Sequence, residues 1–404
     1  MVPVAALWLF FAQTPDFSAE GLKALEEGKY ETAVQAFTKA IGADPADYFA
    51  HFNLAMAYSL LRKDAEGIAE YRKTLELKPG LYEAELNAGI LLLRQKNPAD
   101  ALPLLEDAAS QKATEFRPRY YLAEAQLQTG SPGKAVENYR LAAQSDPKSA
   151  ATELGWAHAL ARAGKLTDAA PHFRQAVQLD PGYRDSLLEL ADLYEQNHQQ
   201  FEAIAIYREF PENAAVQQHL GALLLNNQQY ADAIPQLEQA LRNNPTNGNR
   251  IALATTYVLT QQTEKALPLL EKAVAEEPSN YEVRMVYGRA LRDRRQFPAA
   301  AVQFNEATRL KPDSVETWSE LGGMLYLAGD YPRSLSALDR ARQLGDDTPG
   351  SWFLRAIMLD SLKQRKPALD AYQRFLALSQ GKNPDREFQA RQRARIIQRE
   401  LEKR

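Results

Sequence analysis

The residues that could do chemistry in this chain of 404 residues are its histidines and its many carboxylates. No two of the histidines have the spacing of four that puts two metal ligands on one helix face, so the sequence predicts no dedicated metal site. The chain has no cysteine, which excludes disulfides, thiolate metal sites and cysteine nucleophiles. The five histidines are His51, His158, His172, His198 and His219.

Sequence motifs of enzymes are also missing. The chain has no phosphate loop, dinucleotide fingerprint, Gly-x-Ser-x-Gly elbow or His-Glu-x-x-His helix. Pairs of Asp and Glu are common, but on amphipathic helices such pairs are most often a solvated face. We therefore expect a protein that is not an enzyme and that has no catalytic residue and no cofactor.

Composition and charge narrow the classes of partner. With 45% hydrophobic and 25% charged residues, the chain resembles an ordinary folded protein. The net charge of −4 gives no general attraction to nucleic acid or to anionic lipid. The charge is uneven, because residues 381–404 hold eight Lys and Arg against four Asp and Glu. This basic end requires an explanation of its own.

The N-terminus begins with an apolar run, residues 1–12, and no Lys or Arg precedes Lys23. The run is too short to span a bilayer but has the length of the apolar region of a signal peptide. A signal peptide predicts a mature protein that begins near Gln13 and is secreted or lies in a bacterial periplasm. A retained apolar tail on a cytoplasmic protein is the alternative, because the run lacks a basic start and bulky Phe10 lies near the cleavage point.

One motif recurs along the chain and is its strongest signal. It consists of an Ala, an aromatic residue or Leu four positions later, a second Ala and then a Pro. It occurs as Ala33, Phe37, Ala40 and Pro45, as Ala169, Phe173, Ala176 and Pro181, and as Ala300, Phe304, Ala307 and Pro312. A second pattern lies upstream, and Trp318-x-x-Leu321-Gly322 is its fullest form.

These spacings fit two antiparallel helices in each repeat unit. Apolar residues at i, i+3, i+4 and i+7 put one stripe on each helix. Small residues let the two helices approach closely, an aromatic ring fills the space between them, and the Pro ends the second helix. A Pro inside the second helix should shorten or bend its start, and this applies to Pro103, Pro171, Pro235 and Pro268.

The repeat resembles the tetratricopeptide repeat family, which has about 34 residues in each unit. The resemblance covers roughly residues 14–383 as eleven units. It implies an all-α fold, a right-handed superhelical solenoid of stacked antiparallel helix hairpins. The units are expected to start near Thr14, Tyr48, Tyr82, Phe116, Ala150, Arg184, Ala214, Asn247, Tyr281, Val315 and Pro349.

Two departures from the repeat are informative. The unit that ends at Phe210-Pro211 has only 30 residues, so residues 210–214 are a candidate hinge. Residues 384–404 are expected to form a basic helix that caps the array, because the last unit of a solenoid must cover its apolar face. Binding of an anionic partner by this helix is the alternative.

The resemblance also implies where a partner would bind. Stacked hairpins form a concave surface lined mainly by the first helix of each unit. The inward positions of the second to fourth units give an apolar and aromatic lining with two amides, which resembles a short version of the asparagine ladder in O-linked N-acetylglucosamine transferases. Asn can grip a peptide backbone, or the amides are merely solvated. The candidates are Phe49, Phe52, Asn53, Met56, Leu86, Asn87, Ile90, Tyr120 and Tyr121.

Two functions remain open from the sequence. The first is a noncatalytic scaffold or adaptor that binds a protein or an extended peptide in its concave groove. The second is a regulatory or substrate-recruiting subunit of a separately encoded enzyme, for envelope assembly or glycan modification. Neither function involves nucleic acid or a stable membrane span. The sequence does not determine the partner or the oligomeric state.

Overall fold

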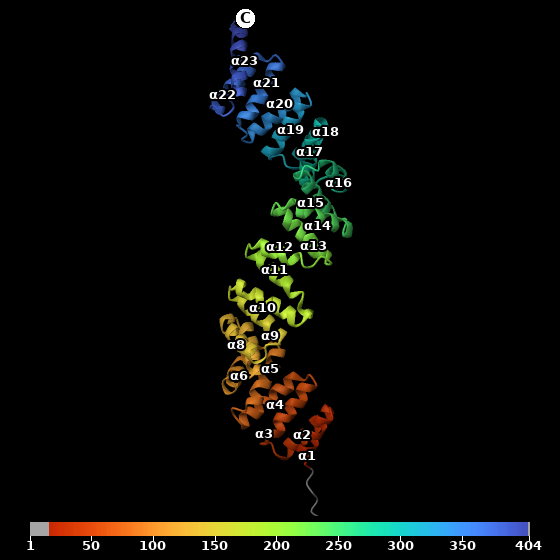
Figure 1. Ribbon diagram of the computed structural model, residues 1–404, viewed down its shortest axis with the longest axis vertical. Coiled ribbons are helices and arrows are strands. Elements are labelled where there is room, and N and C mark those ends of the chain that lie inside the picture. The colour runs from red at the N-terminus through yellow and green to blue at the C-terminus, as the bar shows by residue number, and fades with distance from the viewer. Residues whose placement is uncertain (1–15, 403–404) are drawn as a thin grey trace, which may run out of the picture. The chain divides into compact units, whose positions relative to one another are not determined.

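The structure is a computed structural model that describes residues 16–402, and its ordered elements in this range are helices (Figure 1). The chain divides into two compact bodies, Met1–Ala203 and Ile204–Arg404, each of which is described by itself below. The predicted all-α fold of helix hairpins is confirmed. The N-terminal body contains α1 (Phe17–Glu26), α2 (Tyr30–Ala43), α3 (Tyr48–Leu60), α4 (Asp64–Leu77), α5 (Tyr82–Arg94), α6 (Pro98–Gln111), α7 (Phe116–Gln128), α8 (Pro132–Ser145), α9 (Ala150–Arg162), α10 (Leu166–Leu179), the 3₁₀ turn η1 (Pro181–Tyr183) and α11 (Ser186–Gln196).

The C-terminal body repeats the same pattern of alternating helices. A short helix, α12 (Gln200–Tyr207), spans the boundary between the two bodies. The helices that follow are α13 (Ala214–Asn226), α14 (Tyr230–Asn243), α15 (Asn247–Leu259), α16 (Thr263–Glu276), α17 (Tyr281–Asp293), α18 (Phe297–Leu310), α19 (Val315–Leu327), α20 (Tyr331–Gln343), α21 (Pro349–Ser361), α22 (Arg365–Ser379) and α23 (Pro384–Glu402).

Helix starts follow the repeat frame closely. Helices α3, α5, α7 and α9 begin at the residues where the frame starts a unit, and so do α13, α15, α17, α19 and α21. The sixth unit differs, because its first helix begins at Ser186 and not at Arg184. The segment before it forms η1, in which the Asp180 carboxylate accepts a hydrogen bond of 2.8 Å from the backbone N–H of Gly182. The leader prediction for residues 1–12 lies outside the described residues.

Local signals mark the starts of hairpins and the turns inside them. The Asp47 side chain accepts hydrogen bonds from the backbone N–H groups of Phe49 and Ala50 and so caps the start of α3. At the turn after the first helix the backbone enters the left-handed region. Gly28 has a φ of 71° there, and Arg62 occupies the equivalent place in the next unit with a φ of 60°. Glycine adopts this conformation without strain, which explains why Gly28, Gly130 and Gly164 occur at this turn.

The core of each hairpin is a fit between a small and a large residue. A Cβ atom added to Gly288 of α17 would lie 2.7 Å from the ring of Phe304 in α18. Phe304 is 0% exposed. The pair Gly89 and Leu105 repeats the arrangement in α5 and α6, where the added Cβ would lie 2.6 Å from the leucine. The predicted close approach of the two helices is therefore confirmed.

Internal prolines were expected to shorten or bend the start of the second helix; the shortening is wrong, and the bend stays a prediction. Pro103 lies inside α6 and Pro171 inside α10, and both helices have 14 residues, as do α2 and α4 without such a proline. A proline near a helix start removes a single backbone hydrogen bond. The apolar face that packs on the first helix is unchanged, so the helix keeps its length.

The boundary between the two bodies lies between Ala203 and Ile204, inside the short helix α12. This helix has eight residues, whereas its equivalents α10 and α14 have 14. The hinge at residues 210–214 stays a prediction.

The C-terminal helix α23 packs against α22 through the stripe that the sequence places on one of its faces. Ala390 and Ile397 are 0% exposed, and Ala394 and Leu401 pack against the same buried cluster, which includes Phe375 of α22. This contact covers the apolar face of the last hairpin, as expected of a cap.

We expect the docking of α23 to weaken in acid. The Oε1 atom of Glu387 accepts hydrogen bonds from the Ser379 hydroxyl at 2.6 Å and from the Gly381 N–H at 2.7 Å. The Ser379 hydrogen bond, with help from these backbone donors and from Arg391, lowers the pKa of Glu387 below its usual value of 4.5. A lowered pKa stabilises the fold above the unfolded pKa, and this stability is lost as the pH falls below 4.5. The protection factors of α23 against hydrogen exchange, corrected for the intrinsic pH dependence of exchange, should therefore fall in acid, and this fall should be absent in Glu387→Gln.

Candidate peptide-binding groove

The first helices of successive hairpins line a common face, which we call the inner face. In the N-terminal body α1 contacts α3, α5 contacts α7, and α7 contacts α9. In the C-terminal body α13 contacts α15, α15 contacts α17, and α19 contacts α21. Direct contacts between first helices place their outward side chains next to one another, so a bound chain could touch several units at once.

An apolar stripe on α3 leaves large apolar side chains exposed on this face of the N-terminal body. Phe49 is 42% exposed and Leu60 is 48% exposed, and Phe52 and Met56 between them are half-buried. These positions follow the helical period, so the four side chains share one side of α3. Leu60 was not among the sequence candidates, although its place at the end of the helix continues the stripe.

Phe52 and Asn53 also serve the fold. The Phe52 ring meets Tyr71 of α4 edge-on, with ring centroids 5.6 Å apart, so Phe52 also packs inside its own hairpin. Asn53 is 3% exposed, and its side-chain Nδ2 donates a hydrogen bond of 2.8 Å to the Phe49 carbonyl oxygen. Asn53 is therefore covered and bonded within its own helix, and a ladder of two open amides is not formed.

The candidates on α5 divide between core and surface. Leu86 is 2% exposed and belongs to the buried cluster that includes Leu105, so its assignment to the groove is wrong. The same buried cluster contains Leu122 and Ala125 of α7, the first helix of the next unit. Asn87 and Ile90 are half-buried and keep part of their surface on the inner face.

Aromatic rings continue the face on α7. Tyr120 stacks on Phe116 at 5.5 Å between ring centroids and meets Tyr121 edge-on at 5.2 Å. Burial raises the pKa of Tyr120 above its usual value, so its hydroxyl stays neutral at all physiological pH values. Tyr120 and Tyr121 are both half-buried. They add aromatic surface to the apolar stripe of α3 without adding charge.

Polar and charged groups appear further along the inner face of the N-terminal body. A hollow of about 460 Å³ lies between α9 and α11. His158 and Glu189 face each other across it, with His158 Nε2 at 2.9 Å from Glu189 Oε2. Ala161 and Leu193 contribute apolar lining. The chemistry of the inner face therefore changes from apolar at α3 to polar at α11.

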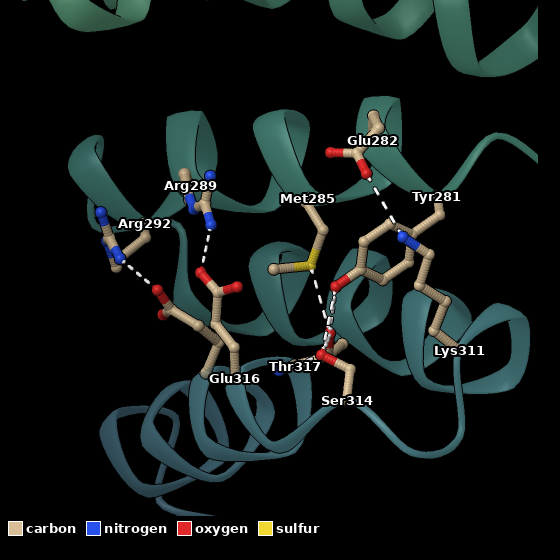
Figure 2. A network of polar contacts seen from close by, with 10 residues as sticks. Tyr281, Glu282, Met285, Arg289, Arg292, Lys311, Ser314, Glu316 and Thr317 are labelled. Atoms are coloured by element: carbon tan, nitrogen blue, oxygen red, sulfur yellow. Dashed lines mark hydrogen bonds and ion pairs between the residues drawn. The ribbon is translucent and has the colours of Figure 1, made fainter.

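On the inner face of the C-terminal body, ion pairs join α17 to α19. Figure 2 shows Arg289 and Arg292 of α17 pointing toward carboxylates of α19. Arg289 pairs with Glu316, and Arg292 Nη1 lies 2.7 Å from Glu320 Oε1. The two arginines are thus neutralised by the next hairpin and do not present free positive charge.

Removal of one of these ion pairs should have a small effect on stability. We expect a double-mutant cycle with Arg292→Ala and Glu320→Ala to give a coupling of about 0.2–1 kcal/mol, as for ion pairs that keep contact with solvent, because the two side chains are 35% and 22% exposed. The coupling should decrease in 1 M salt because the pair is accessible to ions. Urea unfolding of the four variants at low and high salt would measure it, and a coupling above about 2 kcal/mol would contradict this view.

Two periodic contacts were missed from the sequence, although equal spacing could have revealed them. His51 Nδ1 lies 2.5 Å from Glu70 Oε2, and His172 Nδ1 lies 2.6 Å from Glu153 Oε2. In the first pair the histidine is on the first helix of the hairpin, and in the second pair it is on the second helix. A lysine also lies over a tyrosine ring near the start of three units, as Figure 2 shows for Tyr281. The lysine–ring distances are 4.3 Å for Lys78 and Tyr48, 4.1 Å for Lys112 and Tyr82, and 3.9 Å for Lys311 and Tyr281.

Within residues 16–402, no group of three or more His, Asp or Glu side chains is arranged to hold a metal ion. No helix in the same range is both long enough and apolar enough to cross a bilayer.

Comparison with family models identifies the class of protein. Tetratricopeptide repeat models match residues 18–82, 86–150, 251–315 and 288–349, and a second model of the same description matches residues 160–224. Together these matches cover more than half of the chain. The chain belongs to the tetratricopeptide repeat family, whose members are typically noncatalytic scaffolds for interactions between proteins.

Individual relatives share only part of their length with this chain. Small glutamine-rich tetratricopeptide repeat-containing protein 2 of Saccharomyces cerevisiae is 26% identical over 113 residues, which are 27% of this chain and 33% of the relative. Anaphase-promoting complex subunit 7 of Arabidopsis thaliana is 26% identical over 192 residues, 46% of this chain and 34% of the relative. The chain thus spans about a third of the length of these curated relatives.

Solved structures of MamA also match part of the chain. MamA 41-end from Desulfovibrio magneticus RS-1 is 22% identical, with a TM-score of 0.39, over 41% of this chain and 94% of that one. A structure described as MamA AMB-1 is 23% identical, with the same TM-score, over 41% of this chain and 98% of that one.

Proposed function

We propose that this protein is a noncatalytic scaffold that binds an extended apolar segment of another polypeptide on the inner face of its N-terminal body. The observation that carries the proposal is the apolar stripe on α3. Phe49 and Leu60 are large side chains left 42% and 48% exposed on one side of a well-packed helix. Burial of such side chains against a partner would remove apolar surface from water at both ends of the stripe.

The neighbouring surface supports the same kind of partner. Ile90 of α5 and Tyr121 of α7 are half-buried and extend the apolar surface over three consecutive hairpins. Since α5 packs against α4, the partner helix of α3, and also contacts α7, an extended peptide could cross these three hairpins. With Asn53 covered, affinity would come from side-chain contacts and not from a ladder of amides.

Affinity capture with two matched variants would test this function. The full chain, Phe49→Asp and Phe388→Asp would each be used to capture proteins from the source cell, followed by mass spectrometry. Phe388 lies on α23 and is 61% exposed, so it controls for the loss of any exposed Phe. We expect a partner that the full chain and Phe388→Asp retain and that Phe49→Asp loses. Equal capture by all three proteins would contradict the proposed surface.

The identity of the captured partner would also decide between the two functions that the sequence leaves open. If the partner is an enzyme whose activity changes on binding, the chain is a regulatory or substrate-recruiting subunit. If the partner has no activity that responds, the chain is an adaptor.

We further propose that residues 1–12 are a cleaved leader and that the mature protein is periplasmic or secreted. The support is the apolar run without Lys or Arg before Lys23. N-terminal sequencing of the protein from its source should then find a start near Gln13 in the extracytoplasmic fraction. Intact Met1 on protein from the cytoplasm would contradict the leader.

A further inference from the structure

A second hollow, of about 400 Å³, lies in the C-terminal body beside the second helices of two hairpins. It is open to solvent, and it differs from the inner face because α18 and α20 contribute most of its polar lining. Its lining combines a tryptophan, two arginines and two small polar side chains over an apolar floor. The lining residues are Asn305, Trp318, Leu321, Leu325, Arg333, Ser336, Ala337 and Arg340.

The floor of this hollow is fixed in place. The indole Nε1 of Trp318 donates a hydrogen bond of 2.9 Å to the Pro312 carbonyl oxygen, which sets the orientation of the half-buried ring. Leu321 and Leu325 follow Trp318 on α19 and are only 3% and 5% exposed. A flat or branched apolar group could therefore pack against the ring without rearrangement of the core.

The charge of the hollow is positive and poorly compensated. Its lining contains no carboxylate. Arg340 makes no ion pair within residues 16–402, and its Nη1 donates only to Gln343 Oε1, at 3.2 Å. Arg333 reaches the Asp330 carboxylate at 3.4 Å and has a side chain that is 66% exposed. Both guanidinium groups can thus donate hydrogen bonds to the carboxylate of a bound ligand.

The spacing of the two arginines predicts the distance between the two acidic groups of a ligand. Arg333 and Arg340 are seven residues apart on α20, which places them on one side of the helix about 10 Å apart. A chain in the polyproline II conformation rises about 9 Å over three residues, and the side chains of residues i and i+3 point in the same direction. Two acidic residues at i and i+3 would therefore match the two arginines, and a residue between them would turn toward Trp318.

We propose that this hollow binds an extended acidic segment of a partner protein, with carboxylates at i and i+3 and an apolar side chain between them. The carboxylates pair with Arg333 and Arg340, and the apolar side chain packs on Trp318. The site is independent of the apolar stripe on α3, so either binding surface can fail in an experiment without the other.

A pair of short peptides would test the proposal on the full chain. Acetyl-Glu-Phe-Ala-Glu-amide carries the two carboxylates and the aromatic residue, and acetyl-Gln-Phe-Ala-Gln-amide has the same shape without charge. We expect isothermal titration calorimetry to show binding of the acidic peptide about tenfold tighter than that of the neutral peptide, since two exposed ion pairs are lost. Trp318 emission should change on binding, and Trp318→Phe should remove that signal.

Two variants would show where the peptide binds. The double variant Arg333→Glu/Arg340→Glu should weaken binding of the acidic peptide about tenfold. Arg309→Glu is the control, because Arg309 lies on the neighbouring helix α18, is 71% exposed and is not part of the lining. Thermal unfolding curves of the variants should match that of the parent.

Several results would overturn the proposal. These are no binding of the acidic peptide at about 1 mM, equal binding of both peptides, or equal loss of affinity in Arg309→Glu. Inorganic phosphate provides the last comparison. If phosphate displaces the peptide at concentrations near the peptide's own dissociation constant, the hollow is a site for small anions and does not recognise an acidic segment.

Discussion

Replacement of Phe304 by Ala should destabilise its hairpin by about 3–5 kcal/mol, the usual cost of truncating a fully buried aromatic ring. The ring is 0% exposed and fills the space that Gly288 leaves between α17 and α18. The cavity cannot collapse easily, because the glycine has no side chain to move into it. Hydrogen exchange is the appropriate measurement, since repeat arrays need not unfold in a single step.

Val302 provides the control for this experiment in the same helix. It is 57% exposed, so Val302→Ala should change stability by less than about 0.5 kcal/mol. We expect faster exchange across α17 and α18 in Phe304→Ala and no change in Val302→Ala. Similar exchange in the two variants would mean that the contact between Gly288 and Phe304 does not hold the hairpin together.

The double variant Phe49→Asp/Leu60→Asp should weaken partner binding by about 2 kcal/mol or more, the effect expected when two large apolar anchor residues of an interface are lost. Both side chains are exposed in the free protein, so the same variant should lose little stability, on the order of 0.5 kcal/mol for each residue. Isothermal titration with the captured partner and thermal unfolding of the free protein would measure the two effects separately.

A matched charge change elsewhere controls for repulsion of the partner by added carboxylates. Phe388→Asp/Ile396→Asp adds the same charge on α23, where both side chains are exposed, at 61% and 42%. This control should bind the partner normally. A variant at Phe52 and Asn53 would be a poor test of binding, because Phe52 contacts Tyr71 and Asn53 is buried. A loss of affinity there could result from disturbance of the fold.

The repeat frame could be predicted from the sequence because each hairpin builds its own core. The small residue of the first helix and the large residue of the second, such as Gly288 and Phe304, lie 16 positions apart and meet in space. Local spacing therefore predicts their contact. Helix starts such as Tyr48 and Tyr281 follow for the same reason, because each unit repeats the same local pattern.

The inner face was harder to predict because its exposure depends on the neighbouring hairpin. Leu86 occupies an inward position in the repeat, but it is covered in the structure, whereas Leu60 at the end of the previous first helix stays exposed. The arginines of α17 are a second example. Arg292 could be read as a basic surface until the structure showed Glu320 of the next unit beside it. A contact between units depends on how the units stack, which no single repeat contains.

The fit between a small and a large residue inside one hairpin has a consequence for how such a chain can grow. A duplication of one complete unit copies both the small residue and the large residue, so the core of the new hairpin is already well packed. A duplication that starts in the middle of a unit instead joins the first helix of one unit to the second helix of another, so the core of that hairpin combines halves from different units. Contacts between hairpins, such as Arg292 with Glu320, must instead be acquired after duplication. Differences between units should therefore accumulate first at their borders and last in their cores.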